Sequence, residues 1–233
     1  MKKLENASSI TKLVDVSKIF GSNEQKTTAV QNVSLHASAG ELLLLLGPSG
    51  SGKTTLLTLI AGLLKPTSGT ISLFGKNIES YSGKELQQIR ASKIGFIFQT
   101  FLLIDSLTAV ENVGVVLRFT GKTKNEAHNQ AIRLLQQFHI EHLARKFPPT
   151  LSQGEKQRVA VARAIANGAE LIIADEPTGS LESKQGFDII QLLQSYSKEQ
   201  NRCVIIASHD LRLVEFADRI LRLEDGMILQ ANE

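Results

Sequence analysis

A glycine-rich loop between an apolar run and a helical run constrains the fold of this chain most strongly. Residues 42–46 read LLLLL, residues 47–54 read GPSGSGKT, and residues 53–64 read KTTLLTLIAGLL. The uniform apolar run predicts a strand buried on both faces, and the apolar spacing after the loop predicts a helix. A strand, the pattern G-x-x-x-x-G-K-T and a helix, in this order, predict a phosphate-binding loop rather than an ordinary glycine-rich turn.

The residues of this loop suit phosphate chemistry. Glycines allow backbone N–H groups to converge on phosphate oxygens, and the helix that follows directs its positive end at the same anion. Lys53 would place a charge beside the outer phosphates, and the Thr54 hydroxyl would ligate Mg²⁺. We expect nucleotide binding through Gly47, Pro48, Ser49, Gly50, Ser51, Gly52, Lys53, Thr54 and Thr55.

A second apolar run, LIIADEP at residues 171–177, ends in two acids. Asp175 would hold Mg²⁺ through water, and Glu176 would polarise a water for in-line attack on a γ-phosphate. The plain alternative is that the two acids only cap the strand. Opposite a phosphate-binding loop, the pair predicts a nucleoside triphosphatase of the phosphate-loop class, without saying which one.

The remaining strands predict an α/β fold: a phosphate-loop NTPase core with a parallel sheet and an N-terminal antiparallel β subdomain. Residues 11–20 and 28–37 alternate apolar and polar side chains, as half-buried antiparallel strands do. Buried strands at 170–175 and 203–208 alternate with helical patterns, as in a parallel sheet. Residues 219–230 predict two further strands joined by an Asp-Gly turn.

A helical pattern fills most of the chain between the strands at residues 93–98 and 170–175. We interpret this block as a helical subdomain inserted into the core, at about residues 100–166. The whole chain, residues 1–233, is then expected to form a single nucleotide-binding domain.

The composition sets limits on function. A formal net charge of +3 and a pI near 9.0 are too balanced to argue for nucleic-acid binding. Cys203 is the single cysteine, so we expect a buried thiol in a reducing compartment and no internal disulfide. No run approaches the roughly 18 apolar residues of a membrane helix, and the N-terminus has no apolar signal segment. We therefore expect a soluble protein that reaches a membrane only through a partner.

The segment LSQGEKQR at residues 151–158, followed by VAVARAI, resembles the signature motif of ABC ATPases. Other features stand in the order and at the spacing of that family. They are Phe20, in the place of the aromatic residue on adenine; Gln99, in the glutamine loop; Ser180-Leu181-Glu182, in the D-loop; and His209, in the place of the switch histidine. Each is weak alone, but the ordered set spans essentially the whole chain and is specific.

This resemblance implies an ATPase that uses ATP and Mg²⁺ and acts as a homodimer. In the family, two such domains pair head to tail, so that the signature loop of one faces the γ-phosphate held by the other. The residues expected to contact the partner's ATP are Ser152, Gln153, Gly154 and Glu155. The residues expected in catalysis are Glu176, His209, Gln99 and Lys53. The residues expected to hold Mg²⁺ are Thr54, Gln99 and Asp175.

Three positions depart from the family's commonest pattern. Gln153 stands for a glycine and Glu155 for a glutamine in the signature, and Glu182 stands for an aspartate in the D-loop. A side chain at position 153 is tolerated where the backbone angles are ordinary, so we expect activity to survive. The longer Glu182 side chain leaves the fine geometry across the dimer open.

Some of these residues have plainer alternatives. Gln99 would otherwise be a polar cap at a strand end, and Phe20 an ordinary core residue. Among the five histidines, only His209 follows a strand that leads to the site. We expect the others to be structural: His36, His128, His139 and His142. We expect the signature helix to be braced by Arg158 and Arg163.

Two segments indicate the kind of ABC ATPase. Residues 94–113 and 175–186 resemble the subfamily of lipoprotein release and macrolide export. The resemblance implies an ATP-binding subunit, peripheral on the cytoplasmic face of the inner or plasma membrane, that drives a separate permease docked near Gln99. We expect Phe101 to Asn112 to line the docking groove, and no nucleic-acid partner. The alternatives are a soluble ABC ATPase that acts on nucleic acid or ribosomes, and a complex that relays a mechanical signal.

Overall fold

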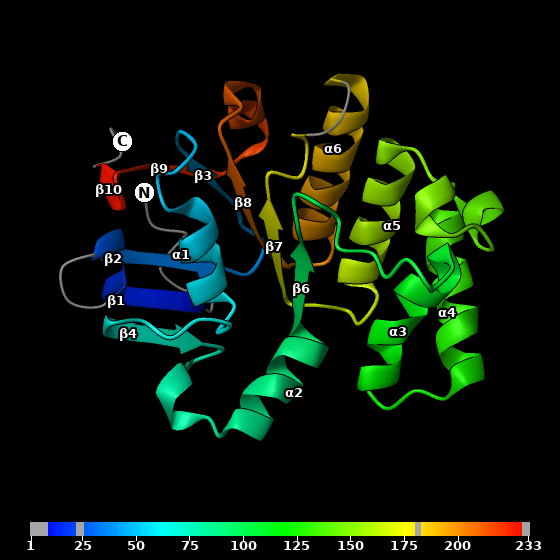
Figure 1. The fold of residues 1–233 in the computed structure, drawn as a ribbon, viewed down its shortest axis with the longest axis horizontal. Helices are drawn as coiled ribbons and strands as arrows, with labels where there is room; N and C mark the ends of the chain where they lie inside the picture. The colour runs from blue at the N-terminus through cyan, green and yellow to red at the C-terminus, as the bar shows by residue number, and fades with distance from the viewer. Residues whose placement is uncertain (1–8, 22–25, 180–182, 230–233) are drawn as a thin grey trace.

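The computed structural model describes residues 9–21, 26–179 and 183–229, in which two sheets and a helical block follow one another (Figure 1). The large sheet has the strand order β10-β9-β3-β8-β7-β6. Its strands are β3 (Leu42–Leu46), β6 (Ile94–Ile97), β7 (Leu171–Asp175), β8 (Cys203–Ser208), β9 (Arg219–Glu224) and β10 (Met227–Leu229). Neighbours pair in parallel except β10, which pairs antiparallel with β9. The parallel core predicted from the sequence is confirmed.

The small sheet is antiparallel and has the order β2-β1-β4-β5. Its strands are β1 (Ser9–Phe20), β2 (Thr27–Ser38), β4 (Ser68–Leu73) and β5 (Lys76–Asn77). Helix α1 (Lys53–Ile60) packs between the two sheets, and its leucines share one core with both. It ends earlier than the pattern to Leu64 indicated, because Gly62 turns the backbone into the left-handed region.

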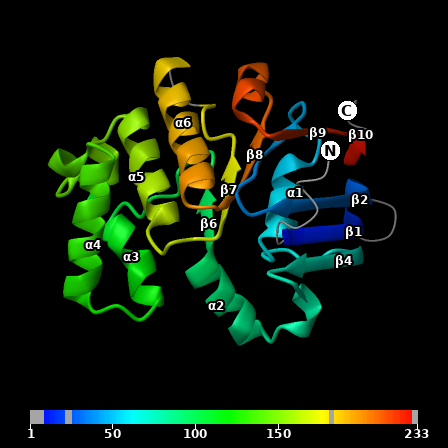
Figure 2. The same ribbon diagram turned by 180° about the vertical axis from the view of Figure 1, so that it is seen from behind.

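The central strands β3, β7 and β8 are buried along their whole length because both of their faces are covered, whereas β9 and β10 carry exposed residues. Leu43 and Leu45 of β3 face the core that contains α1, whereas Leu42 and Leu44 face a second core. This second core holds helices α3 (Ala109–Phe119), α4 (Lys124–Gln137), α5 (Gln153–Ile165) and α6 (Ser183–Glu199). Figures 1 and 2 show α3, α4 and α5 gathered at the end of the molecule farthest from the antiparallel sheet.

Helix α2 (Gly83–Lys93) has no counterpart among the elements predicted from the sequence. None of its side chains is fully buried, and Leu86 and Ile89 pack only partly against the core, so its apolar periodicity is too weak to predict a helix. A capping box between Ser82 and Glu85 defines its start instead. Short 3-10 helices complete the fold: η1 (Ile78–Ser80), η2 (Glu141–Leu143), η3 (Pro148–Thr150) and η4 (Leu211–Phe216).

Cys203 begins β8 and is buried, and this burial raises the pKa of its thiol. This position matches the buried core thiol expected from the sequence. In the described part of the chain, no helix combines the length and the apolar character that crossing a membrane requires.

Candidate functional site

The glycine loop joins the carboxyl end of β3 to α1 and needs glycine for steric reasons. Gly52 has a φ of 98°, and a Cβ there would lie 2.1 Å from the Ala29 carbonyl oxygen of β2. A Cβ at Gly47 would lie 2.1 Å from the Leu223 carbonyl oxygen of β9. Neighbouring backbone therefore fixes the loop tightly against both sheets, which holds the start of α1 in place.

Lys53 is the buried cation of this loop. Its Nζ donates hydrogen bonds to the carbonyl oxygens of Gly47, at 2.7 Å, and Pro48, at 2.9 Å. The same Nζ lies 3.5 Å from Oε1 of Glu176, and only 6% of the side chain is exposed. The positive charge therefore stands between the loop and the acid that follows β7.

Asp175 closes β7 beside the start of α1. Its Oδ2 accepts a hydrogen bond from the Thr54 hydroxyl at 2.7 Å, whereas its buried Oδ1 has no hydrogen-bond partner among the described residues. Burial raises the pKa of Asp175, and the neighbouring Glu176 adds to this effect. An unpaired carboxylate oxygen next to a hydroxyl is a hard-oxygen set of the kind that Mg²⁺ prefers, so these residues fit that ion.

Replacing Asp175 with Asn should raise the melting temperature of the protein in EDTA at neutral pH. A carboxyl whose pKa is raised on folding loses stabilising free energy as the pH rises through that pKa, and an amide avoids this loss. The difference in melting temperature between variant and wild type should vanish at a pH well below the usual pKa of Asp, where Asp175 is protonated in both the folded and the unfolded chain. Thermal melts between pH 3 and pH 8 measure it. A lower melting temperature for the variant at pH 7 would contradict the raised pKa.

Glu176 is held by groups at the carboxyl end of β8. Ser208, which ends β8, donates its hydroxyl to Oε2 at 3.1 Å, and His209 Nδ1 lies 3.0 Å from Oε1. Glu176 has a φ of 46°, in the left-handed region that costs a non-glycine residue about 1–3 kcal/mol. Its N–H donates to the Ala207 carbonyl oxygen at 2.9 Å, which helps to hold the strained backbone. The carboxylate is thus fixed beside Lys53.

A hollow of about 350 Å³ opens over these groups. Of the residues predicted for nucleotide, metal and catalysis, it is lined by Ser49, Gly50, Gly52, Lys53, Thr54, Thr55, Gln99, Asp175, Glu176 and His209. Gly47 and Pro48 contribute carbonyl oxygens to Lys53, and Ser51 is buried beneath the loop. Phe20 is not in this lining. It lies at the end of β1 with 43% of its surface exposed, and its ring centroid lies 5.2 Å from Lys18 Nζ.

The sequence interpretation missed several residues of the hollow. Thr27, Thr28 and Ala29 line it from the start of β2, and no motif points to them. Ser208 was also missed, although its place at the end of the buried run CVIIAS, directly before His209, is a signal. Polar residues where parallel strands end are typical of ligand sites.

The signature segment lies apart from this hollow and forms the start of α5. Ser152 is the N-cap: its N–H donates to Glu155 Oε2 at 2.7 Å, and its hydroxyl accepts from the Glu155 N–H at 3.3 Å. The Ser152 N–H is the main reason why the pKa of Glu155 is lowered. Gln153 does not have a positive φ. Its backbone angles are therefore ordinary, and a side chain is tolerated at this position. None of Ser152, Gln153, Gly154 and Glu155 lines the described hollow of its own chain.

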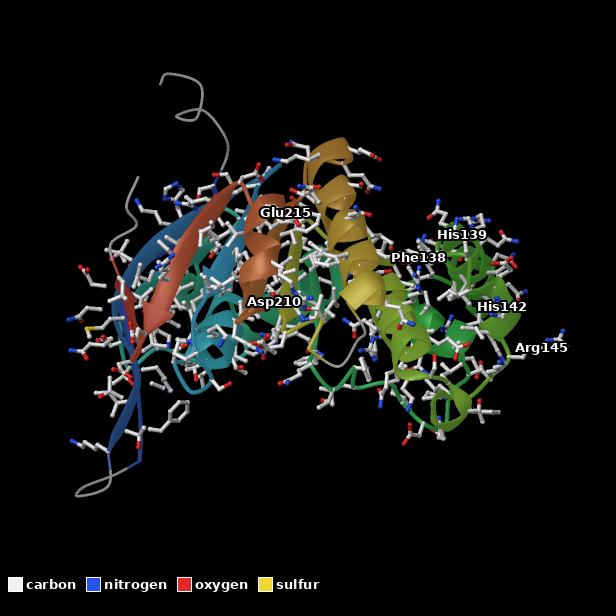
Figure 3. All side chains as sticks on the ribbon, turned by 90° about the horizontal axis from the view of Figure 1, so that it is seen from above. Phe138, His139, His142, Arg145, Asp210 and Glu215 are labelled. Carbon is white, nitrogen blue, oxygen red and sulfur yellow. The ribbon has the colours of Figure 1, made fainter. Side chains whose placement is uncertain are left out.

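The remaining predicted residues are dispersed. Arg158 bridges α5 to α6 through Asp188 at 3.0 Å, and Arg163 donates to backbone carbonyls after Gln99. Figure 3 shows His139 and His142 at the outer end of the helical block, far from Asp210, which follows His209 directly. The predicted D-loop residues, Ser180, Leu181 and Glu182, lie outside the described residues.

Comparison with known proteins gives consistent matches. The family model described as ABC transporter matches residues 30–179. An uncharacterized ABC transporter ATP-binding protein of Methanocaldococcus jannaschii is 40% identical over 221 residues, which cover 93% of this chain and 94% of that protein. A dimeric structure of that cassette in a post-hydrolysis state, bound to ADP and Pi, has a TM-score of 0.89 at 39% identity, covering 94% of this chain and 97% of that one.

Two further relatives carry names that refer to transport. The putative hemin import ATP-binding protein HrtA of Staphylococcus haemolyticus is 38% identical over 218 residues, covering 93% of this chain and 97% of its own. The macrolide export ATP-binding/permease protein MacB of Agrobacterium fabrum is 35% identical over 214 residues, covering 92% of this chain but 33% of its own.

Proposed function

The chain belongs to the ABC transporter family of ATP-binding proteins, and from that premise we propose which of its residues bind and hydrolyse ATP. As a member of this family it is an ATP-binding and ATP-hydrolysing subunit of a membrane transporter. The observation that carries the proposal is the convergence of Lys53, Asp175 and Glu176 on one hollow at the carboxyl ends of β3, β7 and β8.

In the proposed site, the glycine loop binds the phosphates of ATP through backbone N–H groups and Lys53. Thr54, Asp175 and Gln99 would hold Mg²⁺, which when bound supplies positive charge against the phosphate oxygens. Glu176 orients the attacking water as its hydrogen-bond acceptor, and this role is supported by its fixed carboxylate. His209 would hold the γ-phosphate, and the exposed ring of Phe20 would stack on adenine.

We propose that two copies of the chain pair head to tail. The support is that Ser152 to Glu155 stand exposed or half-buried on α5, away from the hollow of their own chain. An exposed helix start with serine and glycine suits a phosphate delivered by another copy. The Methanocaldococcus relative is dimeric in its solved structure. Mass measurement of the Glu176→Gln variant with ATP tests this pairing.

A separate permease is the proposed membrane partner, and it would keep the protein on the cytoplasmic face. A groove of about 330 Å³ lies between α2, β6, α3 and the end of α5, where Arg163 is part of its lining. Its lining includes the exposed apolar side chains of Leu102 (55% exposed), Ile104 (44%) and Phe119 (68%). Exposed apolar side chains gathered in a groove suit an apolar helix of a partner. The groove shares residues with the predicted docking stretch, Phe101 to Asn112.

Replacing Leu102 with Asp should abolish recovery of the permease with this chain, because a buried carboxylate without a partner is costly at an apolar contact. The measurement is affinity purification of the tagged chain from detergent-solubilised membranes of its own cells. Met227→Asp, on the edge strand β10, is the matched control and should retain the permease. Equal recovery with both variants would mean that the permease contacts another surface.

We assign the transporter to the export and lipoprotein-release side of the family. Support comes from the resemblance of residues 94–113 to that subfamily and from the name of the MacB relative. The name of the HrtA relative points to import. The test compares cells that carry the wild-type chain with cells that carry Glu176→Gln and measures the movement of a labelled substrate. Export that is lost with the variant supports the assignment, and uptake that is lost with the variant contradicts it.

A further inference from the structure

We propose that Arg163 is a positioning residue that ties the docking loop, residues 101–108, to helix α5. Movement of the signature end of α5 would then reach the surface at which a permease docks. The inference rests on the proposed function, because the signature end moves only if it meets the nucleotide of a second copy.

The contact is a fork that spans two successive carbonyl groups. Arg163 stands in the last turn of α5 and donates through one guanidinium nitrogen to Leu102 O at 2.6 Å and through the other to Phe101 O at 2.7 Å. Arg163 is half-buried, and this burial lowers the pKa of its guanidinium. A half-buried guanidinium that meets two carbonyls in this way forms charge-assisted hydrogen bonds, which are stronger than neutral ones.

The backbone that Arg163 contacts is strained. Phe101 has a φ of 62° and Leu102 a φ of 44°, two successive non-glycine residues in the left-handed region. Such conformations persist only where the surroundings hold them. Phe101 anchors its ring in the interior, while Leu102 stays 55% exposed in the groove. The turn that Arg163 stabilises is therefore the one that presents Leu102.

The two ends of the docking loop are attached to different helices. Buried Asn112 of α3 accepts from the Ile104 N–H at 2.8 Å and donates to the carbonyl oxygens of Ile104, Leu107 and Thr108. This amide fixes residues 104–108 to α3. Arg163 of α5 provides the corresponding side-chain attachment for residues 101–102.

The other end of α5 reaches the nucleotide chemistry. Ser152 caps its start, and buried Gln157 donates to the Pro177 carbonyl oxygen at 2.8 Å, one residue after Glu176. A continuous helix of 13 residues is a rod about 20 Å long. One rod thus touches the proposed γ-phosphate contact, the catalytic segment and the docking loop, and Arg163 is its connection to the loop.

Amide hydrogen exchange of the full chain tests the attachment without nucleotide. Replacing Arg163 with Met should speed exchange in peptides that cover residues 99–104 by about tenfold or more, because the amides of Phe101 and Leu102 donate within the turn that the guanidinium holds. Arg158→Met, an arginine of the same helix that bonds Asp188, is the matched control and should leave these peptides unchanged.

Arg163→Lys keeps the charge but loses the planar fork, so it should also speed exchange in these peptides. It supplies the test if Arg163→Met fails to fold, and slow exchange in strand β3 confirms the fold of either variant. Unchanged exchange at residues 99–104 in a folded Arg163 variant would overturn the assignment.

The second arm adds ATP and Mg²⁺ to chains that also carry Glu176→Gln. Dimer formation should change hydrogen exchange in the docking loop of the Glu176→Gln variant and of the Glu176→Gln/Arg158→Met double variant. The Glu176→Gln/Arg163→Met double variant should still dimerise, but exchange in its docking loop should not change. An unaltered loop response with Arg163→Met, or loss of its dimer, would overturn the relay. If Glu176→Gln itself forms no dimer, the chain does not pair by itself, which overturns the relay for the isolated chain, and the nucleotide-free arm still decides the attachment.

Discussion

Replacing Glu176 with Gln should lower the rate of ATP hydrolysis by roughly 10²–10⁴-fold while leaving ATP binding intact. The carboxylate lies beside Lys53 and is fixed by Ser208 and His209, so it is placed to accept a hydrogen bond from an attacking water. Glutamine keeps the size of the side chain and an oxygen acceptor but removes the negative charge that polarises the water. The steady-state release of phosphate measures the loss.

The same variant should accumulate closed dimers in ATP and Mg²⁺. If bound ATP holds two copies together and hydrolysis releases them, blocking hydrolysis traps the closed state. Gel filtration with light scattering, with and without ATP, gives the mass. Glu199→Gln, an exposed acid at the end of α6, is the control and should behave like the wild type.

Each outcome has a distinct meaning. A shift to the dimer together with lost turnover supports both the role of Glu176 and the site shared between copies. Retained turnover would contradict the assignment of Glu176 as the group that orients water. Lost turnover without a dimer would leave the chemistry in place and show that pairing needs the permease, or that Gln153 and Glu182 weaken the interface.

Local pattern was enough to predict the core of the fold. The buried parallel strand β3 is uniformly apolar, and β7 is apolar up to Asp175 at its end. A glycine loop of this pattern between a strand and a helix is typical of phosphate binding. Helix α2 escaped prediction because none of its side chains is fully buried and its apolar pattern is weak. Its start carries the pattern S-x-x-E, which also begins α5 at Ser152 and Glu155, so capping chemistry was the available signal.

The charged residues of the candidate site could be named from the sequence, but their contacts could not. Order along the chain pointed to Lys53, Asp175 and Glu176, whereas the left-handed backbone of Glu176 follows from packing between strands. The bond of Arg163 to Phe101 joins residues 62 positions apart, and no periodicity encodes it. A contact between a side chain and a carbonyl group far away in the sequence depends on the tertiary fold. A single sequence gives the types of the residues but not which of them meet.

Replacing Lys53 with Met should weaken ATP binding by about 10²–10⁴-fold, since a charged hydrogen bond contributes about 1.5–3 kcal/mol and the amine would serve the two outer phosphates. In the described structure this buried Nζ rests on the carbonyls of Gly47 and Pro48, within the loop that would receive the nucleotide. Titration with a fluorescent ATP analogue measures the affinity. Lys84→Met, on the exposed face of α2, is the control.

Lys53 Nζ and Glu176 Oε1 lie 3.5 Å apart. Comparison of Lys53→Met with Glu176→Gln nevertheless separates ATP binding from ATP hydrolysis. Lys53→Met should fail at the first step, so it should form no dimer at ATP concentrations that trap Glu176→Gln. The double variant should behave like Lys53→Met, because a chain that does not bind ATP gains nothing from blocked hydrolysis. Affinity close to that of the wild type in Lys53→Met would show that the phosphates bind elsewhere and that the Lys53–Glu176 pair only stabilises the fold.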